Sequence, residues 1–417
     1  MLTLRRAAVL ILTLSTLSTG PAQAEWQGGA GFYVGYNSQV VDPTRLTNPT
    51  LARGLGALTA SLAPFVVWNG EYGRLTAYVR LQGEGDLFVF VPYSGVGGAY
   101  RGTLITRLDA KISETRTWSL ALSGSAGSFN GGQSSAIPGG VPLEGLNVIA
   151  TDFVSLDGRS LFSFKETTRF EVSQQTVFRT FIPYSLFTPS TGGPVTGPSY
   201  SVDAQGIASY YWQRFSLGGD LLAGWFLPPA RSDGTANGSI INLRLGSRAS
   251  VDLAPRLSAQ AQAGLSVATE AANFFSPSKT VVNPVGEFTL QKLFSRPEIE
   301  TAFIYSHSAS AEVAIGRFSN SDSLSLRAIA PLHPDVSLTT EAAYRYSRGT
   351  SLTPGPSFHV VQIDATVRWN FNEYLQLFGR YQFVYQARVG LASDPSPVRD
   401  FNRNVVLLGL TFMYPAR

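Results

Sequence analysis

Residues 243–267 read LRLGSRASVDLAPRLSAQAQAGLSV, and apolar and polar residues alternate through most of this stretch. Successive side chains of a β-strand point to opposite faces, so a period of two predicts a strand with one apolar and one polar face. The alternation is interrupted at Ala254-Pro255-Arg256, which has the length and composition of a hairpin turn. The stretch therefore predicts two antiparallel strands joined by a tight turn.

The same unit recurs along the chain. Strands are predicted at Val361–Trp369 and Leu375–Tyr385, and lone strands near Gly28–Asn37 and Asn404–Tyr414. Longer connections rich in Gly, Pro, Ser and Asn, such as Ser128–Pro142, alternate with the short turns, which gives about eighteen strands. The short turns are expected near Trp68–Gly73, Ser113–Arg116, Ser173–Gln175, Gln213–Arg214, Ala254–Arg256, Ser295–Pro297, Pro331–Asp335 and Asn370–Glu373.

The composition excludes several classes of protein. Charged residues make up 14% of the 417 residues, well below the level of a typical soluble domain, and there are 41 glycines. The absence of cysteine excludes disulfide frameworks and thiolate metal sites. A formal charge of +4, dispersed along the chain, does not suggest a nucleic-acid partner.

The N-terminus predicts the compartment. Residues 1–24 combine Arg5 and Arg6, an apolar run from Ala7 to Leu17, and an A-x-A site at Ala22–Ala24. This pattern is typical of a cleaved secretory signal peptide, which leaves residues 25–417 as a single mature domain. No later apolar run is long enough for a membrane-spanning helix, so a membrane role would have to use strands.

One sheet of this size has two open edges unless it closes into a ring. Aromatic residues lie toward the ends of the predicted strands, as in the girdles of membrane barrels. We therefore predict an all-β fold, a transmembrane antiparallel up-and-down β-barrel of about eighteen strands, with both termini in the periplasm. Two charges, Glu166 and Lys292, fall on the lipid-facing side of this phasing, which places each near an interface or signals a local error of register.

The C-terminus carries a family resemblance. Residues Val406, Leu408, Leu410, Phe412 and Tyr414 alternate up to a near-terminal aromatic, followed only by Pro-Ala-Arg. This resembles the C-terminal β-signal of bacterial outer-membrane barrels, although in that family the aromatic is commonly the last residue. The resemblance implies the outer membrane of a diderm bacterium, with outer-membrane lipid and the barrel-assembly machinery as partners.

A barrel of about eighteen strands is too wide to be filled by its own side chains, so an aqueous channel is expected. Strand-like sequence begins soon after the signal peptide, which leaves no room for a plug domain. The loops Asp86–Gly98 and Ser128–Gly158 are long enough to fold inward. The predicted pore-lining residues are Arg107, Lys111, Asp220, Arg244, Arg248, Asp252, Glu341, Arg345, Asp364, Arg368 and Arg380.

The predicted function is passage of hydrophilic cargo. In strand number the chain is similar to barrels that form the outer-membrane pore of exopolysaccharide export systems, which would imply a periplasmic polysaccharide-export protein and a polysaccharide as partners. The alternatives are a general or substrate-selective diffusion porin and a structural or adhesive barrel with a closed lumen. An enzyme is disfavoured, because only His307, His333 and His359 are available as bases and the serines beside His307 would point to the opposite face. No cofactor and no metal site are expected.

Overall fold

The computed structural model describes part of the chain. The described residues are 23–40, 55–91, 96–129, 151–165, 167, 169–184, 198–229, 238–271, 278–295, 298–312, 317–353, 357–389 and 401–414.

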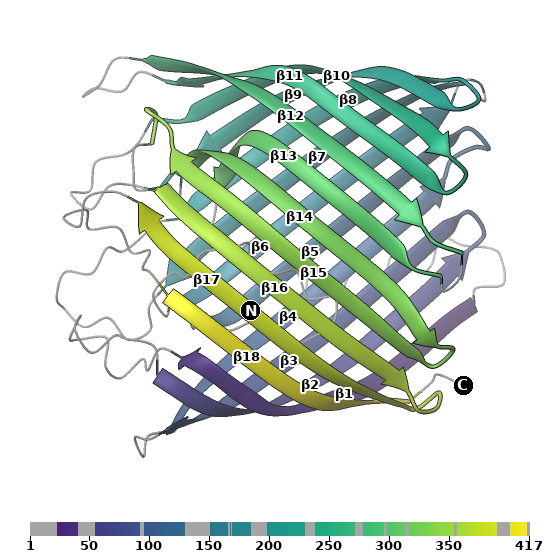
Figure 1. Ribbon diagram of the computed structural model, residues 1–417. Coiled ribbons are helices and arrows are strands. Elements are labelled where there is room, and N and C mark those ends of the chain that lie inside the picture. Colours follow the sequence, from purple (N-terminus) through teal and green to yellow (C-terminus); the bar gives the residue numbers. More distant parts are fainter. Residues whose placement is uncertain are drawn as a thin grey trace.

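Within these ranges the chain forms eighteen strands in one antiparallel sheet (Figure 1). The strands are β1 (Gln23–Val40), β2 (Leu55–Tyr72), β3 (Leu75–Val91), β4 (Val96–Lys111), β5 (Arg116–Phe129), β6 (Thr151–Lys165), β7 (Phe170–Tyr184), β8 (Ser199–Tyr211), β9 (Phe215–Leu227), β10 (Ile240–Ala254), β11 (Leu257–Glu270), β12 (Lys279–Leu293), β13 (Glu300–Glu312), β14 (Arg317–His333), β15 (Val336–Gly349), β16 (Ser357–Asn370), β17 (Leu375–Val389) and β18 (Phe401–Tyr414).

The sheet closes on itself. Each strand pairs with the next one along the chain, and β1 pairs with β18 from Gly28 opposite Tyr414 to Asn37 opposite Val405. Closure leaves the ring without a first or last edge, and the strands run obliquely around the barrel in Figure 1. The predicted up-and-down barrel of about eighteen strands is therefore confirmed.

The two faces of the sheet differ in chemistry as the alternation predicted. Leu221, Leu245 and Leu265 lie opposite one another on β9, β10 and β11, and each is more than half exposed. Their neighbours Asp220, Arg244 and Gln262 point to the other face and contact one another. An exposed apolar outer face around a polar inner face is the arrangement of a barrel that spans a bilayer.

Aromatic residues gather near both ends of this outer face. Trp26, Trp68 and Tyr72 contact one another in sequence near one end, where the short turns lie. A second group there joins Trp212 to Tyr210 and to Phe215. Toward the other end Trp225 and Tyr344 are exposed. Such rings of amphipathic aromatics mark the two interfaces of a membrane.

The registers fix the width of the ring. When the paired residues are followed from strand to strand once around the ring, the path returns to β1 displaced by about 22 residues, which is the shear of the barrel. For eighteen strands this shear gives a strand tilt of about 40° to the barrel axis and a backbone radius of about 17 Å. Inward side chains of about 6 Å would leave a lumen of about 20 Å between the walls. The strands alone therefore enclose a wide space.

The short turns show how local sequence sets the hairpins. The β10–β11 turn has Pro255 followed by Arg256 with φ of 67°, and the β2–β3 turn has Gly73 with φ of 61°. Proline presets the first of these conformations and the next residue must then take a positive φ, which costs arginine more than glycine. Among the predicted short turns, one is wrong: Ser173–Gln175 lies inside β7, and the chain turns instead between Lys165 and Phe170.

Of the two predicted inward loops, the first is corrected and the second is shortened at its ends. Asp86–Val91 belongs to β3 and residues 96–98 to β4, so only residues 92–95 connect them. In the second loop, residues 151–158 belong to β6, and residues 130–150 lie outside the described part of the chain. The segment Asp86–Gly98 is thus mostly wall.

Glu166 and the signal segment up to residue 22 lie outside the described residues, and β1 begins at Gln23, two residues before the predicted mature N-terminus. Lys292 lies one residue before the end of β12, on the outer face, with its ammonium 4.7 Å from the ring centre of Phe294. Lys292 therefore lies near the end of a strand, which is the place near an interface that the sequence analysis gave as one of two explanations for its charge. Among the described residues, no helix is long and apolar enough to cross a membrane.

Leu245→Arg tests the assignment of the outer face. Leu245 is at the middle of β10 and 68% exposed, so an arginine there would face hydrocarbon and lower the free energy of unfolding by about 2–4 kcal/mol. Gln260→Arg is the matched control, because Gln260 is exposed on the inner face of β11 and an arginine there meets water. Urea-dependent unfolding in lipid vesicles measures both, and equal losses would contradict the assignment.

Candidate functional site

The candidate site is the inner surface of the barrel. All the predicted pore-lining residues lie on β4, β9, β10, β15, β16 and β17, in register positions that alternate with exposed apolar residues. For example, Asp364 and Arg368 alternate on β16 with Ile363, Val367 and Trp369 of the outer face. Their part in the passage of solutes stays a prediction.

Asp220 is the centre of one group of these residues. Its carboxylate is almost fully buried and accepts hydrogen bonds from Arg244 Nη2 at 2.9 Å, Gln262 Nε2 at 2.8 Å and Gln205 Nε2 at 3.3 Å. These residues come from β8, β9, β10 and β11, so one carboxylate ties four neighbouring strands together across the inner face. The sequence predicted Asp220 and Arg244 for this wall and missed both glutamines as their partners.

Asp364 forms a second group on the opposite part of the ring. Its Oδ2 accepts bonds from Arg380 Nε at 2.8 Å and Nη2 at 2.6 Å, so two donors of the guanidinium meet one carboxylate oxygen, and Thr366 donates to Oδ1 at 3.2 Å. Gln382 lies beside this pair and accepts a bond from Arg403 Nη2 at 3.1 Å. Arg403 is a buried inner-face arginine that the sequence prediction did not include.

Of the remaining predicted residues, Arg345 belongs to a third group around Glu312 of β13, described below, and the others are not brought into such groups among the described residues. Arg107 pairs only with Asp109 of its own strand, at 2.7 Å, and both side chains are well exposed. No ion pair joins Lys111, Arg248, Asp252, Glu341 or Arg368 to another described residue. Pairs held by several strands stiffen the wall, whereas exposed and unpaired charges face the water of the lumen.

The wall departs from a regular barrel between β12 and β13. β12 pairs with β11 along nearly its whole length, and β13 pairs with β14 along its whole length. Between them, however, pairing ends at Gly286 opposite His307. Pro284 lies two residues beyond Gly286 in the part of β12 not paired with β13, and a proline has no backbone N–H to give to a ladder. Residues 279–285 of β12 and Ser308–Glu312 of β13 are therefore two neighbouring strand edges that do not pair with each other.

The end of β13 and the start of β14 fold into the barrel. We call Ser308–Glu312 and Arg317–Ser321 the inner hairpin. Asn320 shares the outer face of β14 with Leu324 and Leu326, yet its Nδ2 donates to Asn283 Oδ1 on the inner face of β12 at 2.8 Å. An outward residue of β14 can reach the inner face of β12 only if β14 lies inside β12 at this level.

An apolar cluster confirms this position of the inner hairpin. Phe318, on the outer face of β14, is 2% exposed and belongs to one buried cluster with inner-face residues of the opposite wall and with Leu352 of the β15–β16 connection. Val281, Ala309 and Ala311 pack against it. Thr353 Oγ1 donates to the carbonyl oxygen of Phe318 at 2.6 Å and accepts from its N–H at 2.9 Å. The wall residues of the cluster are Phe153, Phe181, Phe226, Ile240 and Ala268.

The other face of the inner hairpin is polar. Glu312 Oε1 accepts hydrogen bonds from Arg345 Nη2, from Ser347 Oγ at 3.0 Å and from Ser319 Oγ at 2.6 Å. Arg317 donates to Ser347 Oγ at 3.2 Å and lies 5.4 Å from the ring centre of Phe358. The inner hairpin is thus held on both sides, by apolar packing against the β6–β12 wall and by charged hydrogen bonds to β15, and it narrows the lumen.

The sequence does carry a signal for the inner hairpin, because the expected alternation of apolar and polar residues breaks down there. The outer face of β14 changes from Leu324 and Leu326 to Asn320 and Asp322, which hydrocarbon would not tolerate well. On β13 the outer face continues through His307 to two alanines. The loss of large apolar residues from the outer face of these two segments, together with Pro284, is the signal that would have identified the inner hairpin.

In the described part of the chain, none of the three histidines is hydrogen-bonded to a serine. His307 Nδ1 lies 2.6 Å from Asp322 Oδ1, on the outer face where β13 leaves β12. Ser306 and Ser308 point to the other face and contact Ser323 and Ser321. His359 Nδ1 lies 2.7 Å from the hydroxyl of Tyr344, in the band of aromatic residues on the outer face. The described residues hold no group of three or more side chains suited to a metal ion.

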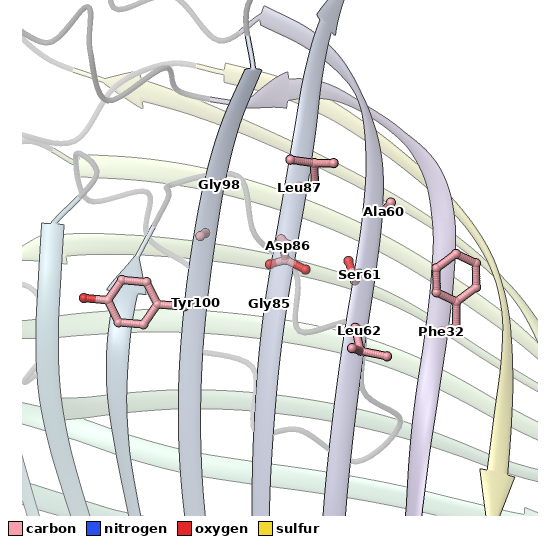
Figure 2. Close-up of a pocket in the computed structure, with 10 residues that line it drawn as sticks. Phe32, Ala60, Ser61, Leu62, Gly85, Asp86, Leu87, Gly98 and Tyr100 are labelled. Atoms are coloured by element: carbon pink, nitrogen blue, oxygen red, sulfur yellow. The ribbon is translucent and has the colours of Figure 1, made fainter.

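A hollow lies on the outer face of β1 to β4, shown in Figure 2. It has a volume of about 480 Å³ and lies where Gly85 and Gly98 interrupt the larger side chains of β1 to β4. Phe32, Leu62 and Tyr100 surround it. Because it is cut into the apolar face, the hollow is separate from the path through the lumen.

The predicted β-signal lies on β18. Its residues Val406, Leu408, Leu410, Phe412 and Tyr414 all face outward and are exposed, and β18 closes the ring against β1. Its recognition by the assembly machinery stays a prediction.

Comparisons with known proteins give only distant similarity. No family model matches the chain, and no curated protein matches it. Among solved structures it is similar to Pseudomonas aeruginosa OccK7 (OpdD), at 11% identity and a TM-score of 0.45 over 95% of this chain and 99% of that one. A BenF-like porin from Pseudomonas fluorescens Pf-5 gives 12% identity and a TM-score of 0.44 over 95% and 98%. Scores this low carry no argument for function.

Asp220→Asn tests the multi-strand ion pair. The change leaves the guanidinium of Arg244 without its counter-charge in a partly buried site, and we expect the free energy of unfolding to fall by about 2–4 kcal/mol. Asp109→Asn breaks an exposed pair of the same chemistry and should cost less than about 1 kcal/mol. Urea-dependent unfolding of the two variants in vesicles would contradict the interpretation if both losses were small.

Proposed function

We propose that the chain is a passive channel in the outer membrane of a diderm bacterium, through which small hydrophilic solutes diffuse. The observation that carries the proposal is the closed ring of eighteen strands with an apolar outer face and a charged inner face. A ring of this size surrounds a space that its own side chains cannot fill.

The inner face requires water. Arg107 and Asp109 expose 62% and 37% of their side chains to the interior, and Arg248 has no ionic partner among the described residues. Isolated charges in a dry interior would cost several kcal/mol each, so such a wall is stable only around a hydrated lumen. A hydrated lumen continuous with both ends of the barrel is a channel.

The inner hairpin favours small solutes over a polymer. It projects from the β12–β13 break across the lumen, and its buried residues show that it fills part of the space near the end opposite the short turns. A channel for an exported polysaccharide would need a continuous wide path. Of the two channel functions predicted from the sequence, the diffusion porin is therefore the one we propose, and export remains without support from the lumen.

The charge pattern favours weak selectivity. Basic and acidic residues alternate around the wall, and the strongest of them neutralise each other, as in Arg244 with Asp220 and Arg380 with Asp364. A wall of mixed sign forms no single-sign field along the lumen. Neutral sugars and solutes of either charge should therefore enter.

Permeability of reconstituted vesicles tests the proposal. We expect proteoliposomes to swell in monosaccharides and disaccharides, to exclude polysaccharide, and to show discrete conductance steps in a planar bilayer. The Asp109→Asn protein serves as a folded control with an altered but open lumen. Failure of every form to conduct or swell, although folded, would overturn the channel function.

A further inference from the structure

A row of polar and aromatic side chains crosses the outer face of β13 to β16. The registers place His307 opposite Asp322, Asp322 opposite Tyr346, and Tyr346 opposite His359. We call these four residues the polar row. Polar and charged groups on an outer face are unfavourable in hydrocarbon, so the polar row needs partners other than acyl chains.

The polar row lies at the edge of the apolar band that is farther from the short turns. Trp369 is exposed at the end of β16, next to a short turn, and His359 lies ten residues before it on the same face. Ten residues of about 3.3 Å each, tilted by about 40°, span about 25 Å along the barrel axis. The apolar band of an outer-membrane barrel is about 25 Å tall, and its short turns face the periplasm. The polar row therefore meets the headgroups of the outer leaflet.

Asp322 offers an open acceptor in the polar row. Tyr305 donates to its Oδ1 at 3.3 Å, and His307 Nδ1 lies 2.6 Å from the same oxygen. Among the described residues no hydrogen bond is made to Oδ2, and 37% of the side chain is exposed. A carboxylate oxygen accepts from O–H and N–H groups and repels a phosphate. Its partner in a headgroup is therefore a hydroxyl or an amide.

Three aromatic rings form a ledge beside this carboxylate. The ring of His359 stacks on Tyr346 with 4.7 Å between ring centres and on Tyr344 with 5.9 Å, and its Nδ1 lies 2.7 Å from the Tyr344 hydroxyl. Stacking and the hydrogen bond fix the three rings before any ligand arrives. The C–H face of a sugar ring packs on aromatic rings, while its hydroxyls need polar groups nearby. A ledge with a carboxylate beside it therefore suits a sugar.

The chemistry of this outer face changes with height. Leu324 and Leu326 are exposed on β14 below the polar row, where they suit acyl chains. Arg348 lies on the outer face of β15, two residues beyond Tyr346 and about 5 Å higher along the barrel axis. It is exposed, and no ion pair joins it to another described residue. Apolar surface, sugar-binding groups and a cation thus follow one another in the order of acyl chains, sugar and phosphate.

We propose that the outer face of β13 to β16 binds a phosphorylated glycolipid of the outer leaflet, with its sugar at the polar row and its phosphate at Arg348. The site faces lipid and not the lumen, so it goes beyond the channel function and does not rest on it. A phospholipid brings a phosphate but has no sugar ring for the ledge and few hydroxyls for Asp322, so it binds more weakly.

Native mass spectrometry of the purified, folded protein in detergent measures the affinity. The probes are lipid A, whose headgroup is a bisphosphorylated glucosamine disaccharide, and phosphatidylglycerol. We expect lipid A to bind more tightly than phosphatidylglycerol. Asp322→Ala and Arg348→Gln should each weaken the binding of lipid A by about tenfold, which corresponds to the loss of one hydrogen bond to a charged group.

Tyr36→Leu is the matched control. Tyr36 is an exposed tyrosine on the outer face of β1, and the residues opposite it are the apolar Leu58 and Val406. The control should leave the affinity for lipid A unchanged. Heat-dependent gel mobility shows that each variant is folded, and Arg348→Gln, one residue from the end of β15, keeps the test open if Asp322→Ala does not fold.

Three results would overturn the glycolipid site. Equal affinity for lipid A and phosphatidylglycerol would mean ordinary contact with an interface. Unchanged binding of lipid A in both Asp322→Ala and Arg348→Gln would place the lipid elsewhere. A dimer in the same spectra that Asp322→Ala abolishes would make a second copy of the chain the occupant. Absent conductance together with selective binding of lipid A would reject the channel function and leave the glycolipid site standing.

Discussion

The structure depends on one constraint, which is that backbone N–H and C=O groups must find partners within the sheet when the surrounding solvent is hydrocarbon. Eighteen strands satisfy it by closing into a ring, with β1 against β18 as the last seam. Closure fixes the width of the lumen through strand number and register, and it forces alternate side chains to face lipid and lumen. The polar inner wall and the apolar outer wall are consequences of that single geometry.

The break between β12 and β13 is the exception, and it shows how the constraint can be met in another way. Where the ladder stops at Gly286, the freed hairpin turns its outer face toward the opposite inner wall and buries Phe318 there. Polar residues that could not face hydrocarbon, such as Asn320, find partners inside the barrel. The barrel thereby gains a constriction built from its own wall strands.

Period-two alternation proved to be a strong predictor wherever one face meets lipid and the other meets water. It located the hairpins at 243–267 and 361–385 and the last strand, because each side chain there has only one acceptable environment. It failed at Ser173–Gln175, where a polar run inside β7 looks like a turn. It failed again at Asp86–Gly98, where glycines in strands resemble a loop, since glycine in a sheet signals a close approach as readily as a turn.

The sequence by itself determined the fold class, the approximate strand number, the inner face of the predicted pore-lining charges and the absence of thiol chemistry, because these follow from local periodicity and composition. Which charges meet was decided only by the tertiary structure: Asp220 gathers partners from three other strands, and Glu312 reaches Arg345 two strands away. The inward fold of the hairpin was decided there too. Residues on one strand carry no information about the distance across the lumen, and that distance exists only once the ring has closed.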